Sequence, residues 1–238
     1  FAAGYNSNNV DGDSTTNGRP SVFVLKLSGP TGTNGKWTVN TDYWRLNVSS
    51  GSATEPNGLG GIASYDSDGD GKTDYLYAGD LLGGVWRFDV RNLGATGGTS
   101  LKRIFTAVDS AGNKQPITAA PALTVGPNFE GVFVVFGTGK MLEPTDLAAT
   151  AGSFPQQTLY GIWGSAGNDI YVVGGNGVMA RSTTGGVTWT GLTSGTTSVL
   201  RGVWGSAANN VFAVGDTGTI LRSVNSGAVW TKIQSNVT

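Results

Sequence analysis

Four aspartates within nine residues form the part of the sequence with the clearest chemistry. They occupy positions 1, 3, 5 and 9 of the loop Asp66–Asp74, and a glycine stands at position 6. This is the spacing of a calcium loop, in which alternate carboxylates converge on one ion and glycine permits the sharp turn. The residue at position 7 can add its backbone carbonyl. The predicted calcium ligands are therefore Asp66, Asp68, Asp70, Asp74 and the carbonyl of Lys72.

The loop departs from an EF-hand at position 12, where Tyr77 stands in place of the bidentate glutamate. Because Tyr77 already belongs to an expected strand, we expect a calcium loop on a β-hairpin instead of a helix–loop–helix. The alternative is a solvated turn whose aspartates bond the loop's own backbone. Four like charges in nine residues would repel one another without a cation, which favours calcium. Magnesium fits less well, since it demands a tight octahedral shell and keeps its waters.

The composition excludes several other kinds of chemistry. The chain has 238 residues with 39 glycines, no cysteine and no histidine, and only 13% of its residues are charged. It therefore cannot build a disulfide framework, a thiolate or histidine zinc site, or a Ser-His-Asp triad. The net charge of −1 without a basic cluster argues against nucleic acid as a partner. No apolar run approaches the roughly 20 residues needed to cross a bilayer, so no membrane insertion is expected.

The elements that must carry the loop are short β-branched and aromatic runs separated by glycine-rich turns, which is an all-β pattern. Residues 159–166 return as residues 200–207, and this offset of 41 holds through Trp189 and Trp230. A period of about 40–45 residues is typical of a four-stranded propeller blade. Looser copies of a strand, a glycine turn and a second strand begin at Tyr75 and Val134 and within residues 1–27. We predict a β-propeller, incomplete or modified, of roughly five blade-like units.

Two motifs in the repeats are similar to the Asp-box, Ser-x-Asp-x-Gly-x-x-Trp. They span residues 182–189 and 223–230, and Thr184 and Asn225 stand at the aspartate position. We interpret both as structural: their polar side chains hold a hairpin turn and their tryptophans pack between blades.

Several segments resemble, in order, the C-terminal propeller of PilY-type proteins, the tip-associated adhesins of bacterial type IV pili. They are residues 56–59, the 66–74 loop, and residues 77–89, 117–122, 134–140 and 157–163. The resemblance covers about residues 1–163, a PilY-like propeller portion with the calcium loop. Residues 159–238 are similar to Asp-box or photosystem-assembly-factor repeats. We expect residues 164–238, as two 41-residue blade repeats, to complete or extend the same propeller. The opening residues read like mid-strand, so we expect the chain to be a portion of something longer.

The resemblance implies a secreted, calcium-binding module outside a bacterial cell, at the pilus tip. It would act in pilus biogenesis, retraction control and surface adhesion, with minor pilins, other pilus tip proteins and a host or abiotic surface as partners. The family's calcium ligands match Asp66, Asp68, Asp70, Lys72 (through its carbonyl) and Asp74, and no adhesive residue can be carried over. The resemblance implies no enzymatic activity.

Two other function classes stay open. An Asp-box-type extracellular glycoside hydrolase would need a pair of carboxylates. Its candidates include Glu55, Asp80, Glu130 and Glu143, and no spacing singles out a pair. The second alternative is a structural subunit of an extracellular filament.

Overall fold

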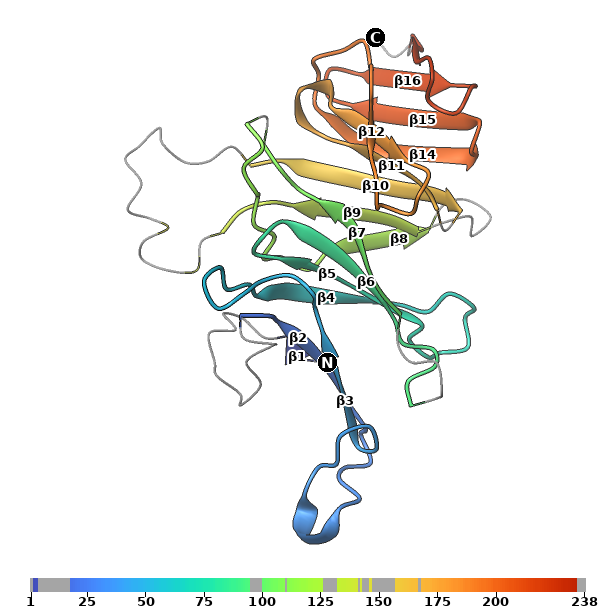
Figure 1. The fold of residues 1–238 in the computed structure, drawn as a ribbon. Coiled ribbons are helices and arrows are strands. Elements are labelled where there is room, and N and C mark those ends of the chain that lie inside the picture. Colours follow the sequence, from blue (N-terminus) through green and yellow to red (C-terminus); the bar gives the residue numbers. More distant parts are fainter. Residues whose placement is uncertain are drawn as a thin grey trace. The chain divides into compact units, whose positions relative to one another are not determined.

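The computed structural model describes residues 2–3, 18–94, 100–109, 111–125, 132–140, 142, 146, 157–166 and 168–234, with the backbone alone at 2, 3, 165 and 166. Within these ranges the chain forms strands, turns and short 3-10 segments and no α-helix, so the all-β prediction is confirmed (Figure 1). The described part of the chain accordingly holds no helix that could span a membrane. The chain divides into two compact units, residues 1–120 with 138–154 and residues 121–137 with 155–238.

The first unit contains two antiparallel sheets. The three-stranded sheet consists of β1 (Ala2–Ala3), β2 (Ser21–Leu25) and β3 (Tyr43–Asn47). The four-stranded sheet is a meander of β4 (Leu59–Tyr65), β5 (Tyr75–Asp80), β6 (Gly84–Asp89) and β7 (Ser100–Thr106). Each strand of the meander pairs with the next one in the chain, which is the arrangement expected of a propeller blade.

The core of this unit is shared by its two sheets. Leu76 and Ala78 of β5 pair with Phe88 and Trp86 of β6, so all four side chains lie on one face of the meander. They form one buried cluster with residues that precede them in the chain and with the residue after β6: Val22, Val48, Leu59 and Val90. Gly79, the residue after Ala78 in β5, leaves space for the Ile117 side chain, since a Cβ on Gly79 would lie 2.1 Å from Cγ2 of Ile117.

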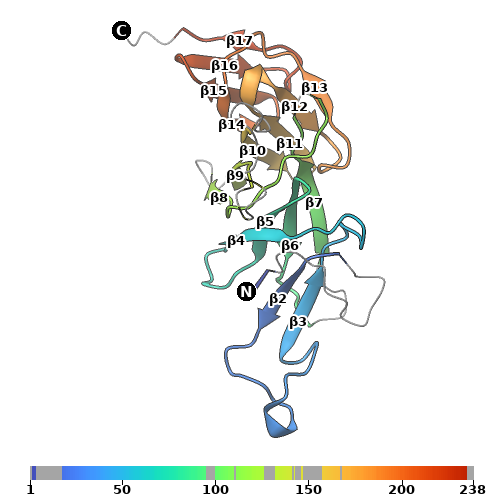
Figure 2. The same ribbon diagram turned by 90° about the vertical axis from the view of Figure 1, so that its left-hand side faces the viewer.

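The second unit contains a six-stranded and a four-stranded antiparallel sheet. The six-stranded sheet consists of β8 (Ala122–Val125), β9 (Val132–Gly137), β10 (Leu159–Ala166), β11 (Asp169–Val173), β12 (Met179–Ser182) and β13 (Thr190–Leu192). The four-stranded sheet consists of β14 (Leu200–Ala207), β15 (Asn210–Gly215), β16 (Thr219–Ser223) and β17 (Thr231–Lys232). The two 41-residue repeats are thus the meanders β10–β13 and β14–β17, which lie side by side in both views (Figures 1 and 2).

One expected hairpin differs from the structure. The sequence pattern assigned residues 134–142 to the central hairpin of a separate blade, but β9 pairs with β8 and with β10 instead. The pairing aligns Phe136 with Tyr160, whose rings stack at 5.4 Å. The described residues therefore form four sheets, and two of the expected blade-like units share the six-stranded one. The boundary expected at residue 163 falls inside β10 and stays a prediction.

Candidate calcium site

The Asp66–Asp74 loop joins β4 to β5 in the first unit (Figure 1). The two strands are paired up to Tyr65 and Tyr75, and the Asp74 amide donates to the Tyr65 carbonyl at 2.9 Å. Gly69 and Gly71 take φ angles of 77° and 84°, in the left-handed region that glycine adopts without strain. The loop thus lies on a β-hairpin, as the sequence predicts.

Three of the four predicted carboxylates come together. Asp66, Asp68 and Asp74 each offer an oxygen, and these oxygens lie within 4.8 Å of one another. Calcium–oxygen distances of about 2.3–2.6 Å allow two ligands of one ion to be at most about 5 Å apart. The cluster therefore has dimensions that suit a single calcium ion.

Asp70 lies in a different arrangement. Its carboxylate accepts hydrogen bonds from Lys72, from the backbone amide at 2.8 Å and from Nζ at 2.6 Å. This contact lowers the pKa of Asp70 and raises that of Lys72. Both side chains are exposed, so the ion pair is screened by solvent and holds Asp70 only weakly. The structure does not bring Asp70 to the other three carboxylates, and ligation by Asp70 and by the Lys72 carbonyl stays a prediction.

Backbone amides of the loop orient the carboxylates. Asp66 accepts hydrogen bonds from the Gly69 amide at 2.7 Å and the Gly71 amide at 2.8 Å, and Asp68 accepts one from the Asp70 amide at 3.1 Å. The Gly71 amide is the main cause that holds the pKa of Asp66 below its usual value, which keeps this carboxylate charged at neutral pH. An ionised carboxylate has about four lone-pair sites, so these bonds leave capacity for a cation.

Asp74 connects the loop to the body of the meander. Its residue is only 7% exposed, and its carboxylate accepts hydrogen bonds from the amide and the hydroxyl of Ser67. Its carbonyl accepts the Val90 amide at 2.8 Å, directly after β6. Burial, with the charges of Asp66 and Asp74, raises the pKa of the neighbouring Tyr65. A cation held by Asp74 would therefore act on the β4–β6 framework as well as on the loop.

The other carboxylates considered for catalysis have different surroundings. Asp80 is fully buried and accepts hydrogen bonds from two side chains and two backbone amides, so it fastens the turn between β5 and β6. Glu55 is exposed and pairs with Lys114 at 2.6 Å. Glu130 and Glu143 lie outside the described residues. The structural role of Asp80 was missed from the sequence, although glycines at positions 83 and 84 after it signal a tight turn.

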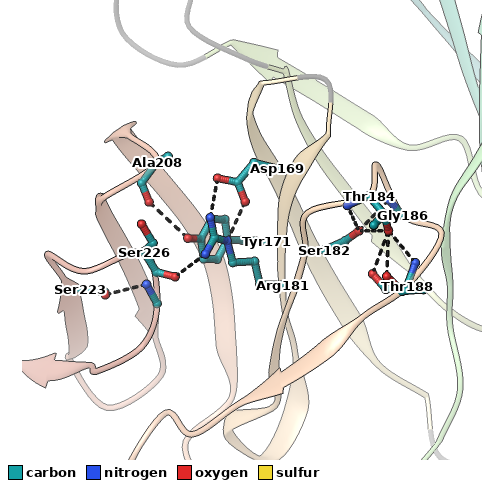
Figure 3. A network of polar contacts seen from close by, with 11 residues as sticks. Asp169, Tyr171, Arg181, Ser182, Thr184, Gly186, Thr188, Ala208, Ser223 and Ser226 are labelled. Carbon is teal, nitrogen blue, oxygen red and sulfur yellow. Dashed lines mark hydrogen bonds and ion pairs between the residues drawn. The ribbon is translucent and has the colours of Figure 1, made fainter.

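The two Asp-box-like motifs are hairpin turns held by their own side chains, as predicted (Figure 3). In the first, the Ser182 hydroxyl accepts the Gly186 amide at 2.8 Å, and the Thr184 hydroxyl accepts the Thr188 amide at 2.8 Å. In the second, the Ser223 hydroxyl accepts the Gly227 amide at 2.8 Å. The partly buried Trp230 packs against the hydrophobic cluster between the two repeats.

Comparison with known proteins decides the family. The family model described as the PilY1 beta-propeller domain matches residues 1–200. This chain belongs to the PilY1 β-propeller family. The PilY1 match confirms both the resemblance and the propeller class predicted from the sequence, and it continues past residue 163 through the whole first repeat.

Curated PilY1 relatives agree with the family model. The type IV pilus biogenesis factor PilY1 of Pseudomonas aeruginosa strain PAO1 is 38% identical over 170 residues, which cover 55% of this chain and 14% of the relative. A PilY1 homolog of Xylella fastidiosa is 34% identical over 173 residues, which cover 69% of this chain and 11% of the relative. The chain thus matches only about a seventh of these relatives or less. The crystal structure of the P. aeruginosa PilY1 C-terminal domain aligns with a TM-score of 0.49 and 24% identity, over 89% of this chain and 54% of that one.

Proposed function

We propose that this chain is a calcium-binding propeller module of a type IV pilus tip protein, acting outside the cell in pilus biogenesis, retraction control and surface adhesion. The pilus role is supported by relatives that are named type IV pilus biogenesis factors. The calcium role is supported by one observation above all, the convergence of Asp66, Asp68 and Asp74 within 4.8 Å. Minor pilins, other tip proteins and a host or abiotic surface are the proposed partners.

Calcium would act on this module as a clamp. It would remove the repulsion among the converging carboxylates and join the exposed Asp68 to the buried Asp74. Because Asp74 also bonds Ser67 and the backbone after β6, the clamp would stiffen the hairpin from which the meander is built. Extracellular modules bind calcium with dissociation constants of about 10⁻⁴–10⁻³ M, and binding to the folded form alone stabilises it by mass action.

Isothermal titration and thermal melting with calcium test the metal proposal. We expect binding with a dissociation constant of about 10⁻⁴–10⁻³ M. Asp68→Asn removes one charge from the cluster. Among the described residues the Asp68 carboxylate bonds only the Asp70 amide, so the variant should weaken calcium binding by about tenfold or more without unfolding the protein. Asp109→Asn is the matched control, because Asp109 is partly exposed and its carboxylate orders a comparable turn outside the cluster. Absence of both a binding heat and a thermal shift would overturn the metal proposal, as would equal effects of the two variants.

Exchange into a pilus system tests the biological role. The segment of P. aeruginosa PilY1 that matches this chain is replaced by residues 1–200, and surface pili are counted by electron microscopy. We expect the exchanged protein to restore pili to a strain that lacks PilY1, and the version with Asp68→Asn to restore fewer at low calcium. An exchanged protein that is secreted at the normal level and yet restores no pili contradicts the proposed role in biogenesis.

A further inference from the structure

The two repeats of the second unit carry the same side-chain pattern on one face. Among the described residues, this face is buried in the first repeat and only partly buried in the second. On the meander β10–β12 this face carries large side chains that are at most 3% exposed: Trp163, Tyr171, Val173 and Met179. Forty-one residues later, the same face of β14–β16 carries Trp204, Phe212, Val214 and Ile220. None of these four belongs to the buried core, and Val214 is 47% exposed.

The first of these faces is covered by the second repeat. The covering side chains form one cluster with it and come from β14–β16: Leu200, Val203, Val211, Ala213 and Leu221. Glycine shapes the contact, because a Cβ on Gly205 would lie 2.8 Å from the Trp163 ring. The same Cβ would lie 2.7 Å from the Asn210 carbonyl oxygen, so glycine is needed at this position both by the hairpin of its own repeat and by the contact with Trp163.

Polar contacts fix the register of this interface (Figure 3). The Tyr171 hydroxyl donates to the Ala208 carbonyl at 3.2 Å, in the turn after β14. Arg181 pairs with Asp169 and also donates to the Ser226 carbonyl at 2.9 Å, in the second Asp-box-like turn. One repeat therefore receives the next through an aromatic face and an arginine that reaches a backbone carbonyl, and the incoming repeat has a glycine where it meets the tryptophan.

The second repeat has the same receiving elements. Its face borders an apolar groove of about 390 Å³, lined by Phe133, Gly202, Trp204, Phe212 and Val214 among others. Arg222 stands at the place of Arg181: it lies over the Phe212 ring at 5.3 Å and is exposed. Only its Nε is bonded within the described residues, to Asn210 at 3.0 Å, where Arg181 uses three nitrogens.

We propose that the face of β14–β16 that carries Trp204, Phe212 and Val214 is the docking surface for a further blade of the 41-residue repeat. The contact between β10–β12 and β14–β16 is the template for this interface. The docking blade presents apolar side chains at the places of Val203, Val211 and Leu221, glycine at the place of Gly205, and a turn carbonyl for Arg222.

A second intact copy of this chain does not meet these requirements. Its own Val203, Val211 and Leu221 already lie against Trp163 and Tyr171 and are at most 2% exposed. The docking blade must therefore come from a sheet whose equivalent side chains are still free.

Thiol protection in a lengthened chain tests the proposal. Residues 198–238 are appended after Thr238 as a third copy in phase with the repeat, and Val214→Cys places one thiol in a chain that has no cysteine. We expect the rate at which this thiol reacts with a disulfide reagent to be lower in the lengthened chain than in the 238-residue chain, by about tenfold or more. Val187→Cys, at a residue that is 75% exposed and on the first repeat, should react equally fast in both chains.

A matched extension separates specific docking from the mere presence of extra chain. In the appended copy alone, Val203→Asp places a charge on the side that docks and should restore fast reaction of the Val214→Cys thiol. The proposal is overturned if the intact extension leaves that thiol equally reactive, or if the extension with Val203→Asp protects it equally well. It is also overturned if circular dichroism shows the intact extension unfolded, because a repeat needs a neighbour to fold on. Concentration-dependent protection in the unextended chain, together with a dimer in size-exclusion chromatography, would overturn it in favour of self-association.

Discussion

Replacing the buried Asp80 should test how strongly one carboxylate holds the β5–β6 turn. Oδ2 accepts hydrogen bonds from Asn57 Nδ2 at 3.0 Å and from Trp86 Nε1 at 2.7 Å. Oδ1 accepts the amides of Leu82 at 2.9 Å and Gly84 at 2.7 Å. An asparagine at this position offers one oxygen in place of two, and its amide nitrogen is a donor. In either orientation of the amide, two of these buried or partly buried donors lose their acceptor.

The expected loss of stability follows from the number of hydrogen-bond donors left without an acceptor. Leaving one buried donor unsatisfied costs about 1–3 kcal/mol, so Asp80→Asn should lower the free energy of unfolding by about 3 kcal/mol. For a chain of this size that corresponds to a fall in melting temperature of about 6–12 °C. Asp80→Ala leaves all four donors without this acceptor and should lower the free energy of unfolding by about 4–5 kcal/mol, at the upper end of single-residue effects.

Urea unfolding followed by circular dichroism measures these differences. Trp86→Phe removes one of the donors that Asp80→Asn would leave unsatisfied. Asp80→Asn should therefore lower the free energy of unfolding by about 1 kcal/mol less in the Trp86→Phe background than in the original protein. Glu55→Gln is the control, because it breaks only the exposed pair with Lys114 and should change stability by less than about 0.5 kcal/mol. If Asp80→Asn also falls below that limit, the hydrogen bonds do not hold the turn and the reasoning is refuted.

Two further outcomes are expected. The Thr31 hydroxyl is the main cause that lowers the pKa of Asp42, so the stability from Asp42 is present above about pH 4 and lost as the pH falls through its folded-state pKa. Asp42→Asn should flatten this acid limb in unfolding curves measured between about pH 2 and 5, and an unchanged limb contradicts the assignment. Arg181→Ala should destabilise the chain by about 1–2 kcal/mol more than Arg222→Ala, since only Arg181 bonds both Asp169 and the second repeat; equal losses in urea unfolding would contradict this.

The parts of the site that the sequence predicted are those determined by neighbouring residues. The spacing of aspartate and glycine in the 66–74 loop predicted both the tight turn and the approach of Asp66, Asp68 and Asp74. The position of Asp70 was not predictable in the same way. Asp70 and Lys72 are exposed and two residues apart, so their ion pair is weak. The state in which Asp70 pairs with Lys72 and the state in which Asp70 joins the other three carboxylates therefore differ little in free energy.

The parts of the fold that the sequence did not predict depend on distant segments. The 41-residue period identified both meanders of the second unit, because each meander is made from adjacent strands. No local feature of the sequence predicts that β9 pairs with β10, since the apolar run of β9 is compatible with pairing to any other apolar strand. Asp80 combines both cases, because Leu82, Gly84 and Trp86 are local partners, while Asn57 lies 23 residues away.

The near-identity of β10 and β14 has a consequence for how the chain finds its register while it folds. Both strands follow the same Leu-x-Gly-x-Trp-Gly-Ser-Ala pattern, so two strands of similar sequence compete for pairing with β9. The segment from Gly137 to Leu159 is about a third as long as the segment from Gly137 to Leu200, which favours the native partner by about 1 kcal/mol in loop-closure entropy. Synthesis from the N-terminus adds a second bias, because β10 leaves the ribosome before β14. Refolding of the complete chain from denaturant lacks that bias, so a mispaired β9–β14 species should accumulate there and not during translation.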